Sequence, residues 1–387
     1  MAGCVTNVSS APISILGWRV KTSKSLIHGG DLQSASEYYG IGVDQWVDLS
    51  TGINPESYPI DRLDTDAFRC LPYLKADFLQ AAKAYYVNEN LLTVSGSQAV
   101  IQLLPECLPE LSILLPKLGY QEHRHQWLQS VSPINDYPAT QNDQAINYIN
   151  AALQKNKSQH LLVINPNNPS GLQFSPAQLQ VWAQQLGKDA YLIIDEAFMD
   201  LQPKNSVLAQ HFEENMIVLR SFGKFFGLAG LRLGFVFSNE EIRENLENRL
   251  GLWAINGPAQ SLATLAFQDK AWQQQAQINI SASAEISRAL FAPLFDDLRS
   301  ERYFQEIHQG LFSSYYLKKG KAEELSDFFA KQGVLLRHIP CNHELEVLRV
   351  GRVSPDNHAA IARIKLAVDE CLKIKNRALN DNQGDFA

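Results

Sequence analysis

Short apolar runs of strand length recur through the first two thirds of the chain, and segments with helical spacing separate them. Each run is apolar at almost every position, which is typical of strands buried on both faces of a sheet. The runs lie at residues 91–94, 111–115, 161–164, 191–194, 216–219 and 233–237. Helical spacing is clearest over 74–87 and 175–186. Apolar strands that alternate with helices predict an α/β fold with a mostly parallel sheet that helices cover on both faces.

The last third of the chain follows a different pattern. The expected elements are helices at 240–250, 259–291, 321–331 and 355–375 and strands at 333–337 and 345–350. The shorter elements near the end predict a compact α+β unit. We therefore expect four parts: an N-terminal arm (1–45) that packs on the small domain, a large domain (46–270), a small α+β domain (271–375) and a flexible tail (376–387).

Composition and charge narrow the class of protein. Hydrophobic residues make up 45% of the 387 residues and charged residues 19%, which is typical of a folded globular protein. The formal net charge of −7 argues against binding to nucleic acid or an anionic membrane, so anionic ligands must be held by local cations. We recognise neither a membrane span nor a secretory leader, and the five cysteines form no CxxC pair. We therefore expect a cytoplasmic protein with reduced thiols and no metal site.

The segment from 221 to 235 carries the clearest candidate chemistry. Ser221, Lys224 and Arg232 place one amine between two anion-binding groups. Phenylalanines on both sides of the lysine keep it poorly hydrated, and desolvation disfavours the charged form of an amine. Because a neutral amine is a nucleophile toward carbonyl groups, this segment predicts Schiff-base chemistry.

Other polar groups follow the ends of the expected strands. The turn around Gly96 and Ser97 leads from a strand into a helix. Such a turn is either a phosphate-binding site or an ordinary connection. Asn168 lies in the proline-rich segment NPNNPSG, and Asp195 ends a buried strand, where a carboxylate needs a cation or several donors. Strand ends of this kind are where α/β sheets collect ligand-binding groups.

Two histidine motifs allow more than one interpretation. The segment after strand 111–115 is expected to be a loop and carries Tyr120, Glu122, His123 and His125. The two histidines could bind a metal, but no acidic or thiol partner follows at ligand spacing, which disfavours that interpretation. His28 begins the segment HGGD, which is either a ligand-approach loop or a surface turn.

Taken in order, four motifs resemble those of the fold-type-I, aspartate-aminotransferase-like enzymes that use pyridoxal 5'-phosphate. The motifs are a strand-SGS-helix unit, NPNNPSG, DEAF, and SFGK with an arginine eight residues beyond the lysine. The resemblance covers about residues 28–375. It implies a three-layer α/β/α fold around a mostly parallel seven-stranded sheet, with a smaller C-terminal α+β domain.

The resemblance also assigns roles to the cofactor site. Lys224 would form the Schiff base with the cofactor and then transfer protons at the substrate Cα, and Asp195 would keep the pyridine nitrogen protonated. Asn168 would donate to the phenolate oxygen, and Tyr120 would stack on the ring. The cofactor phosphate would be held by Gly96, Ser97, Ser221 and Arg232.

Departures from the common pattern point to a subfamily. Phe198 stands where many members have tyrosine, and Leu71 stands where a tyrosine often reaches the partner subunit. With HGGD, DLSTGINP and SFGKFFGLAGLRLGF, these positions look most similar to the L-threonine-O-3-phosphate decarboxylases of the cobalamin pathway. Histidinol-phosphate aminotransferases are the near relatives of that group. The chain has Ser313 where related decarboxylases often have arginine, so the substrate wall is expected to differ.

The implied reaction is decarboxylation of L-threonine O-3-phosphate to (R)-1-aminopropan-2-ol O-phosphate. The expected substrate contacts are His28, Asn54, Arg337 and Arg349, although without the family context the two arginines could equally form surface ion pairs. The alternatives are an aminotransferase acting on histidinol phosphate or another amino acid with 2-oxoglutarate, and a non-catalytic regulator with this fold. Such regulators carry a winged-helix domain, for which about 27 residues before His28 are too few. A homodimer is expected, with no nucleic-acid or membrane partner.

Overall fold

A seven-stranded sheet forms the centre of the larger part of the molecule. The computed structural model describes residues 28–63 and 65–384, so residues 1–27 of the predicted arm and 385–387 of the predicted tail lie outside it. The strand order is β2-β8-β7-β6-β5-β3-β4, and β8 alone runs opposite to the other six strands. The strands are β2 (Leu91–Val94), β3 (Ser112–Pro116), β4 (Ile134–Tyr137), β5 (Gln159–Ile164), β6 (Leu192–Asp195), β7 (Met216–Ser221) and β8 (Gly234–Phe237). The predicted mostly parallel sheet is confirmed.

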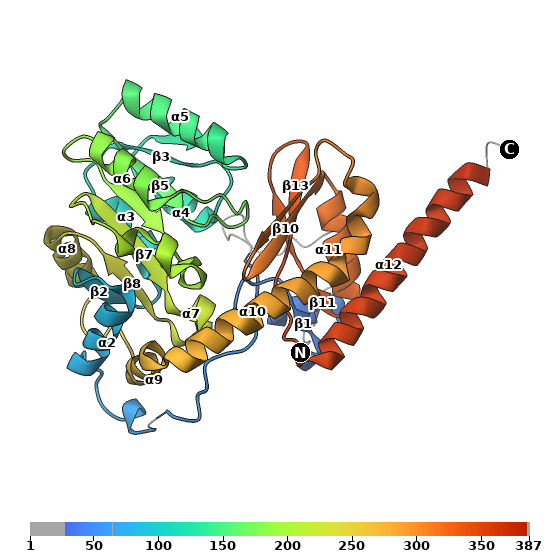
Figure 1. Ribbon diagram of the computed structural model, residues 1–387, viewed down its shortest axis with the longest axis horizontal. Helices are drawn as coiled ribbons and strands as arrows, with labels where there is room; N and C mark the ends of the chain where they lie inside the picture. Colours follow the sequence, from blue (N-terminus) through green and yellow to red (C-terminus); the bar gives the residue numbers. More distant parts are fainter. Residues whose placement is uncertain (1–27, 64, 385–387) are drawn as a thin grey trace, which may run out of the picture.

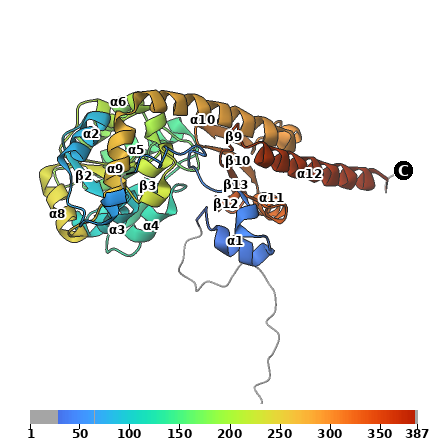
Figure 2. The ribbon, with the colours of Figure 1, turned by 90° about the horizontal axis from the view of Figure 1, so that it is seen from below.

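Helices cover both faces of this sheet, and Figure 2 shows the two helical layers. One layer contains α2 (Ala76–Tyr86), α5 (Asn142–Lys155), α6 (Pro176–Gln185) and α9 (Gly257–Gln268). The other contains α3 (Ser97–Cys107), α4 (Gln121–Trp127) and α8 (Glu240–Leu250). Along β5, Leu161 and Val163 join the core under the first layer, whereas Leu162 and Ile164 join the core under the second. Alternate side chains are thus buried on opposite faces, which explains the continuous apolar runs.

A second, antiparallel sheet forms the smaller part of the molecule. Its order is β12-β13-β10-β9, and the strands are β9 (Gln305–Gln309), β10 (Phe312–Lys318), β12 (Arg337–Pro340) and β13 (Leu345–Val350). Helices α11 (Lys321–Lys331) and α12 (His358–Gly384) and a separate core pack on it. Helix α10 (Lys270–Phe291) contacts both α9 and β10, and Figure 1 shows it running from the larger part to the smaller one.

The N-terminal segment joins the smaller part. Strand β1 (Val47–Asp48) pairs in parallel with β11 (Val334–Leu335), and α1 (Leu32–Tyr39) contacts α11. The Tyr39 hydroxyl donates to Asp327 Oδ1 at 3.0 Å.

The remaining short helices are η1 (Val43–Gln45), η2 (Thr65–Phe68), η3 (Met199–Leu201), η4 (Pro203–Asn205), η5 (Val207–Ala209), α7 (Phe222–Phe225), η6 (Ala229–Leu231) and η7 (Ala292–Leu298).

Several element predictions were wrong in detail. The expected loop after β3 is the helix α4, and the expected helix 259–291 is divided into α9 and α10 at Asp269, whose carboxylate accepts from Trp272 N to cap α10. Helix α12 continues to Gly384, past the end expected at 375. Strands β4, β9 and β10 were not predicted. The sequences of β4 and β9, INDY and QEIHQ, alternate weakly and keep polar, partly exposed side chains at the sheet edges, and that of β10, FSSYYLK, is interrupted by two serines.

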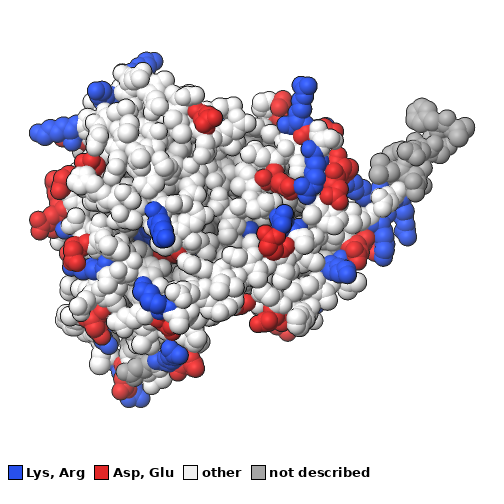
Figure 3. Space-filling view, in the orientation of Figure 1, with Lys and Arg blue, Asp and Glu red and all other residues white. Residues whose placement is uncertain are grey.

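The surface carries both signs of charge. On the face drawn in Figure 3, lysine and arginine lie interspersed with aspartate and glutamate. Within the described residues, no helix has the length and apolar character that a membrane span requires.

Candidate active site

Lys224 lies on α7, the short helix that directly follows β7. Its Nζ lies 5.7 Å from the centroid of the Phe198 ring. The pKa of Lys224 is lowered to about 8, first because burial desolvates the amine and then because Arg349 and Arg232 add positive charge, while Asp195 opposes the shift. The predicted poorly hydrated lysine is therefore present, and its pKa lies closer to neutral pH than that of an ordinary lysine.

Asp195 ends β6 and is buried. Its Oδ1 accepts from Ala197 N at 3.0 Å, and its Oδ2 lies 2.9 Å from His123 Nε2. His123 comes from α4 and is itself only 2% exposed. The sequence interpretation considered His123 only as half of a metal-binding pair with His125. In the structure His125 instead faces Gln129, at 2.8 Å between their Nε2 atoms, so the two histidines have different partners.

The four residues predicted to hold a phosphate come together from three elements. An ideal Cβ on Gly96 would lie 2.7 Å from Arg232 Nη2, so the guanidinium packs directly on this glycine. Gly96 has φ +79°, a conformation that favours glycine. Gly234 pairs with Ser221 across β7 and β8, and its ideal Cβ would lie 2.5 Å from Ser97 N. The Arg232 guanidinium, Gly96 and the Ser97 amide therefore lie together at the start of α3, and Ser221 lies beside them on β7.

Tyr120 immediately precedes α4, and its hydroxyl donates to Gln98 Oε1 at 3.0 Å. The His123 ring lies edge-on to the Tyr120 ring, with 6.2 Å between their centroids. Burial raises the pKa of the Tyr120 hydroxyl well above its ordinary value, and Glu122 and Asp195 add to the effect. The phenol thus stays neutral, and its ring is available for stacking.

Arg349 and Arg337 lie opposite each other on β13 and β12. Arg349 Nη1 donates to Asn168 Oδ1 at 2.7 Å, and Nη2 donates to the carbonyl oxygen of Ser50. The pKa of Arg349 is lowered to about 9, because burial desolvates it and Arg337 adds a like charge. Within the described structure, the Arg349 Nε is buried and has no hydrogen-bond partner. Two neighbouring guanidiniums, of which that of Arg349 is buried, favour an anionic ligand.

His28 and Asn54, the other two predicted substrate contacts, have different partners in the structure. The Nδ2 of Asn54 donates to the Phe225 carbonyl at 2.9 Å, and its Oδ1 accepts from Glu56 N at 3.0 Å. Its backbone N–H donates to the Lys224 carbonyl at 3.0 Å, so Asn54 supports the lysine segment. His28 Nε2 lies 2.6 Å from Glu122 Oε1 on α4.

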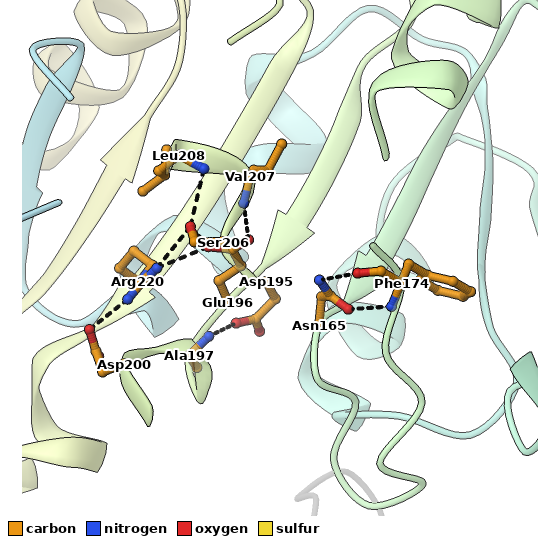
Figure 4. A network of polar contacts seen from close by, with 10 residues as sticks. All are labelled: Asn165, Phe174, Asp195, Glu196, Ala197, Asp200, Ser206, Val207, Leu208 and Arg220. Carbon is orange, nitrogen blue, oxygen red and sulfur yellow. Dashed lines mark hydrogen bonds and ion pairs between the residues drawn. The ribbon is translucent and has the colours of Figure 1, made fainter. Parts of the chain in front are cut away.

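A buried ionic network lies behind Asp195, and Figure 4 shows it. Arg220 on β7 donates to Glu196 Oε2 at 3.0 Å and to Asp200 Oδ1 at 2.6 Å. The carboxylate of Glu196 also accepts from Val207 N at 3.0 Å and from the Ser206 hydroxyl at 2.5 Å. This network ties the segment after β6 to the end of β7, the strands that carry Asp195 and Ser221. Sequence reasoning missed it, although Glu196 directly follows Asp195.

The chain belongs to the aminotransferase class I and II family, whose sequence pattern it matches over residues 61–364. Threonine-phosphate decarboxylase of Pseudomonas aeruginosa is 34% identical over 346 residues, which span 89% of this chain and 97% of the relative. Threonine-phosphate decarboxylase of a Sinorhizobium species is 36% identical over 256 residues, which span 64% of this chain and 73% of the relative.

Solved structures agree on the fold. The histidinol-phosphate aminotransferase of Sinorhizobium meliloti, solved in complex with pyridoxal 5'-phosphate, superposes with a TM-score of 0.73 at 17% identity. The superposition covers 90% of this chain and 96% of that one. The predicted three-layer aminotransferase-like fold is therefore confirmed.

Proposed function

We propose that this protein is a pyridoxal 5'-phosphate-dependent lyase that converts L-threonine O-3-phosphate into CO₂ and (R)-1-aminopropan-2-ol O-phosphate, a step of cobalamin biosynthesis. The observation that carries the proposal is the pair of opposed arginines, Arg337 and Arg349, near the lysine of an aminotransferase-family site. A substrate with a carboxylate and a phosphate carries negative charges complementary to these two adjacent guanidiniums. The 34% identical relative bears the name of this activity.

The residues present fit the cofactor. Lys224 offers an amine with a lowered pKa to the cofactor aldehyde, and Asp195 offers a buried carboxylate to the pyridine nitrogen. Tyr120 would stack on the ring, and Asn168 would donate to the phenolate oxygen. The phosphate would lie against Gly96, where Arg232 leaves no room for a side chain, with Ser97 and Ser221 beside it. When bound, the cofactor supplies an electron sink for the pair released at Cα.

The protein's own groups decide which bond at Cα breaks. Arg349 and Arg337 would orient the two substrate anions and would thereby select which bond at Cα breaks. In the proposed reaction the bond from Cα to the carboxylate breaks and CO₂ leaves. A proton from Lys224 or a bound water then takes its place on Cα, and the lowered pKa of Lys224 suits it to both directions of transfer near neutral pH.

Product analysis tests the reaction directly. Purified protein with added pyridoxal 5'-phosphate is incubated with L-threonine O-3-phosphate, and separately with histidinol phosphate and 2-oxoglutarate. CO₂ release with formation of an aminopropanol phosphate supports the proposal. Glutamate formation without CO₂ release would instead identify an aminotransferase. Turnover that persists in Lys224→Ala would rule out both reactions as written.

We also propose that the protein acts as a homodimer. Large apolar side chains are exposed around η2 and the start of α9, and the Tyr73 and Trp253 rings meet there with centroids 6.1 Å apart. The exposed apolar residues of this patch are Ile60, Phe68, Leu71, Tyr73, Leu74, Leu252 and Trp253. An apolar patch of this kind is typical of a protein interface.

A cytoplasmic location is part of the same proposal. In the part of the chain that the structure describes, Cys70, Cys107, Cys341 and Cys371 are all free thiols. Free thiols are typical of a reducing compartment. Recovery of the native protein from a periplasmic or secreted fraction would contradict this location.

A further inference from the structure

Glu122 lies on α4, two residues after Tyr120, and the proposed reaction gives it no role. Its side chain is 13% exposed. One carboxylate oxygen lies 2.6 Å from His28 Nε2, and the other accepts from Gln98 Nε2 at 3.0 Å. Gln98 Oε1 in turn accepts from the Tyr120 hydroxyl at 3.0 Å. A single carboxylate therefore connects the segment at His28 with the tyrosine of the cofactor site.

The donor and acceptor groups of these side chains fix which partner donates in each hydrogen bond. An ionised carboxylate only accepts, so both the His28 ring and the Gln98 amide must donate to Glu122. Donation from the Gln98 amide nitrogen leaves its oxygen facing the Tyr120 hydroxyl. The position of Tyr120 thus depends on Glu122 through Gln98. The His28 ring also lies beside the Tyr120 ring, at 5.8 Å between centroids.

The other end of the His28 segment is fixed beneath Arg349. Gly30 N donates to Ser50 Oγ at 2.8 Å, and an ideal Cβ on Gly29 would lie 2.2 Å from the Ser50 carbonyl oxygen. That same carbonyl accepts from Arg349. The segment from His28 to Gly30 therefore extends from the support of Arg349 to α4, and Glu122 holds its far end.

We propose that Glu122 is a positioning residue that fixes two parts of the active site together. Through His28 it holds the N-terminal segment beside the site, and through Gln98 it orients the Tyr120 ring on which the cofactor would stack. In this role Glu122 would act through its hydrogen-bond partners, His28 and Gln98. The inference rests on the proposed function for what Tyr120 and His28 contact, whereas the hydrogen bonds that carry it are independent of the substrate.

Two readouts test this role without measuring turnover. The first is hydrogen–deuterium exchange of the peptide around residues 28–34 in the full-length protein. The second is the affinity for pyridoxal 5'-phosphate, from an absorbance titration after dialysis. Glu122→Leu is expected to speed the exchange and weaken the affinity, each by about tenfold, because it removes a charged acceptor shared by two donors.

Single breaks on either side of Glu122 should separate the two effects. Gln98→Leu is expected to weaken cofactor affinity and leave the exchange near the wild-type rate, and His28→Ala is expected to do the opposite. Glu122→Gln keeps the shape of the side chain but offers one acceptor oxygen in place of two. It should therefore speed the exchange, weaken the cofactor affinity, or do both. Glu106→Leu is the matched control, because Glu106 lies near the far end of α3 and forms an exposed pair with Arg249 at 2.8 Å.

The proposal is overturned if Glu122→Leu matches Glu106→Leu in both readouts. It is also overturned if Glu122→Leu speeds exchange equally in all peptides while Glu122→Gln behaves as wild type, because Glu122 would then act only in global stability. Should the wild type release no CO₂ from L-threonine O-3-phosphate, the proposed reaction fails. The exchange and affinity measurements would still decide the role of Glu122.

Discussion

At the scale of single residues, burial determines how Lys224 can react. Its pKa of about 8 leaves a usable fraction of neutral amine at neutral pH, about a tenth at pH 7. We predict that the rate at which the cofactor-free protein captures pyridoxal 5'-phosphate rises with pH through about 8 and then levels off. Stopped-flow absorbance of the bound cofactor measures this rate.

Arg349 provides a check on the cause of that pH profile. Its positive charge contributes to the lowered pKa of Lys224, so Arg349→Met should move the midpoint of the profile to higher pH. Lys224→Ala should give no such absorbance band at any pH. A wild-type midpoint near 10.5, the ordinary lysine value, would show that burial leaves the amine unperturbed.

Among single residues, Gly96 occupies a position that has no room for a side chain. Its φ of +79° disfavours any residue with a Cβ, and that Cβ would displace the Arg232 guanidinium. We predict that Gly96→Ala lowers the free energy of unfolding by about 1 kcal/mol or more and weakens cofactor binding by about tenfold. Urea unfolding and cofactor titration measure the two effects. Gly230→Ala is the control, because nothing lies within 4 Å of an ideal Cβ there; equal losses in both variants would contradict the prediction.

At the scale of elements, a histidine of β5 contacts the segments that lead into the two neighbouring strands, β3 and β6. His160 on β5 is fully buried, its Nε2 lies 2.9 Å from the Pro109 carbonyl, and its Nδ1 accepts from Tyr191 N at 3.1 Å. Because Nδ1 accepts, the ring is neutral, with its proton on Nε2 donated to Pro109. Burial lowers the pKa of His160 below its ordinary value.

This lowered pKa predicts a loss of stability in acid. Below about pH 6.5 the unfolded chain gains a proton at His160 that the folded chain does not, so the free energy of unfolding falls as the pH falls. The slope from this group is at most about 1.4 kcal/mol per pH unit. Urea unfolding between pH 5 and 7 should therefore show a shallower pH dependence in His160→Gln than in wild type. His343→Gln should leave the slope unchanged, because that side chain is 87% exposed.

At the scale of the whole molecule, the sequence was most informative about where candidate residues lie relative to the strands of the large sheet. Lys224, Asp195 and Gly96 follow buried strands whose apolar runs are unmistakable, and the parallel sheet brings those strand ends together. The sequence was least informative where a role depends on a contact between distant segments. His123 was interpreted beside His125, its neighbour in the chain, whereas its partner Asp195 is 72 residues away.

The apolar patch at η2 and α9 is the surface through which the proposed homodimer would assemble. Trp253 is 44% exposed and packs on Tyr73, while Phe68 nearby is 67% exposed. An aspartate in the centre of an apolar interface would be buried without a partner, so we predict that Trp253→Asp shifts sedimentation velocity from dimer to monomer and lowers decarboxylation. Val131→Asp is the matched control, because Val131 is 77% exposed and lies beside the edge strand β4. A wild-type monomer with full activity would refute the dimer, and a dimeric Trp253→Asp variant would place the interface elsewhere on the surface.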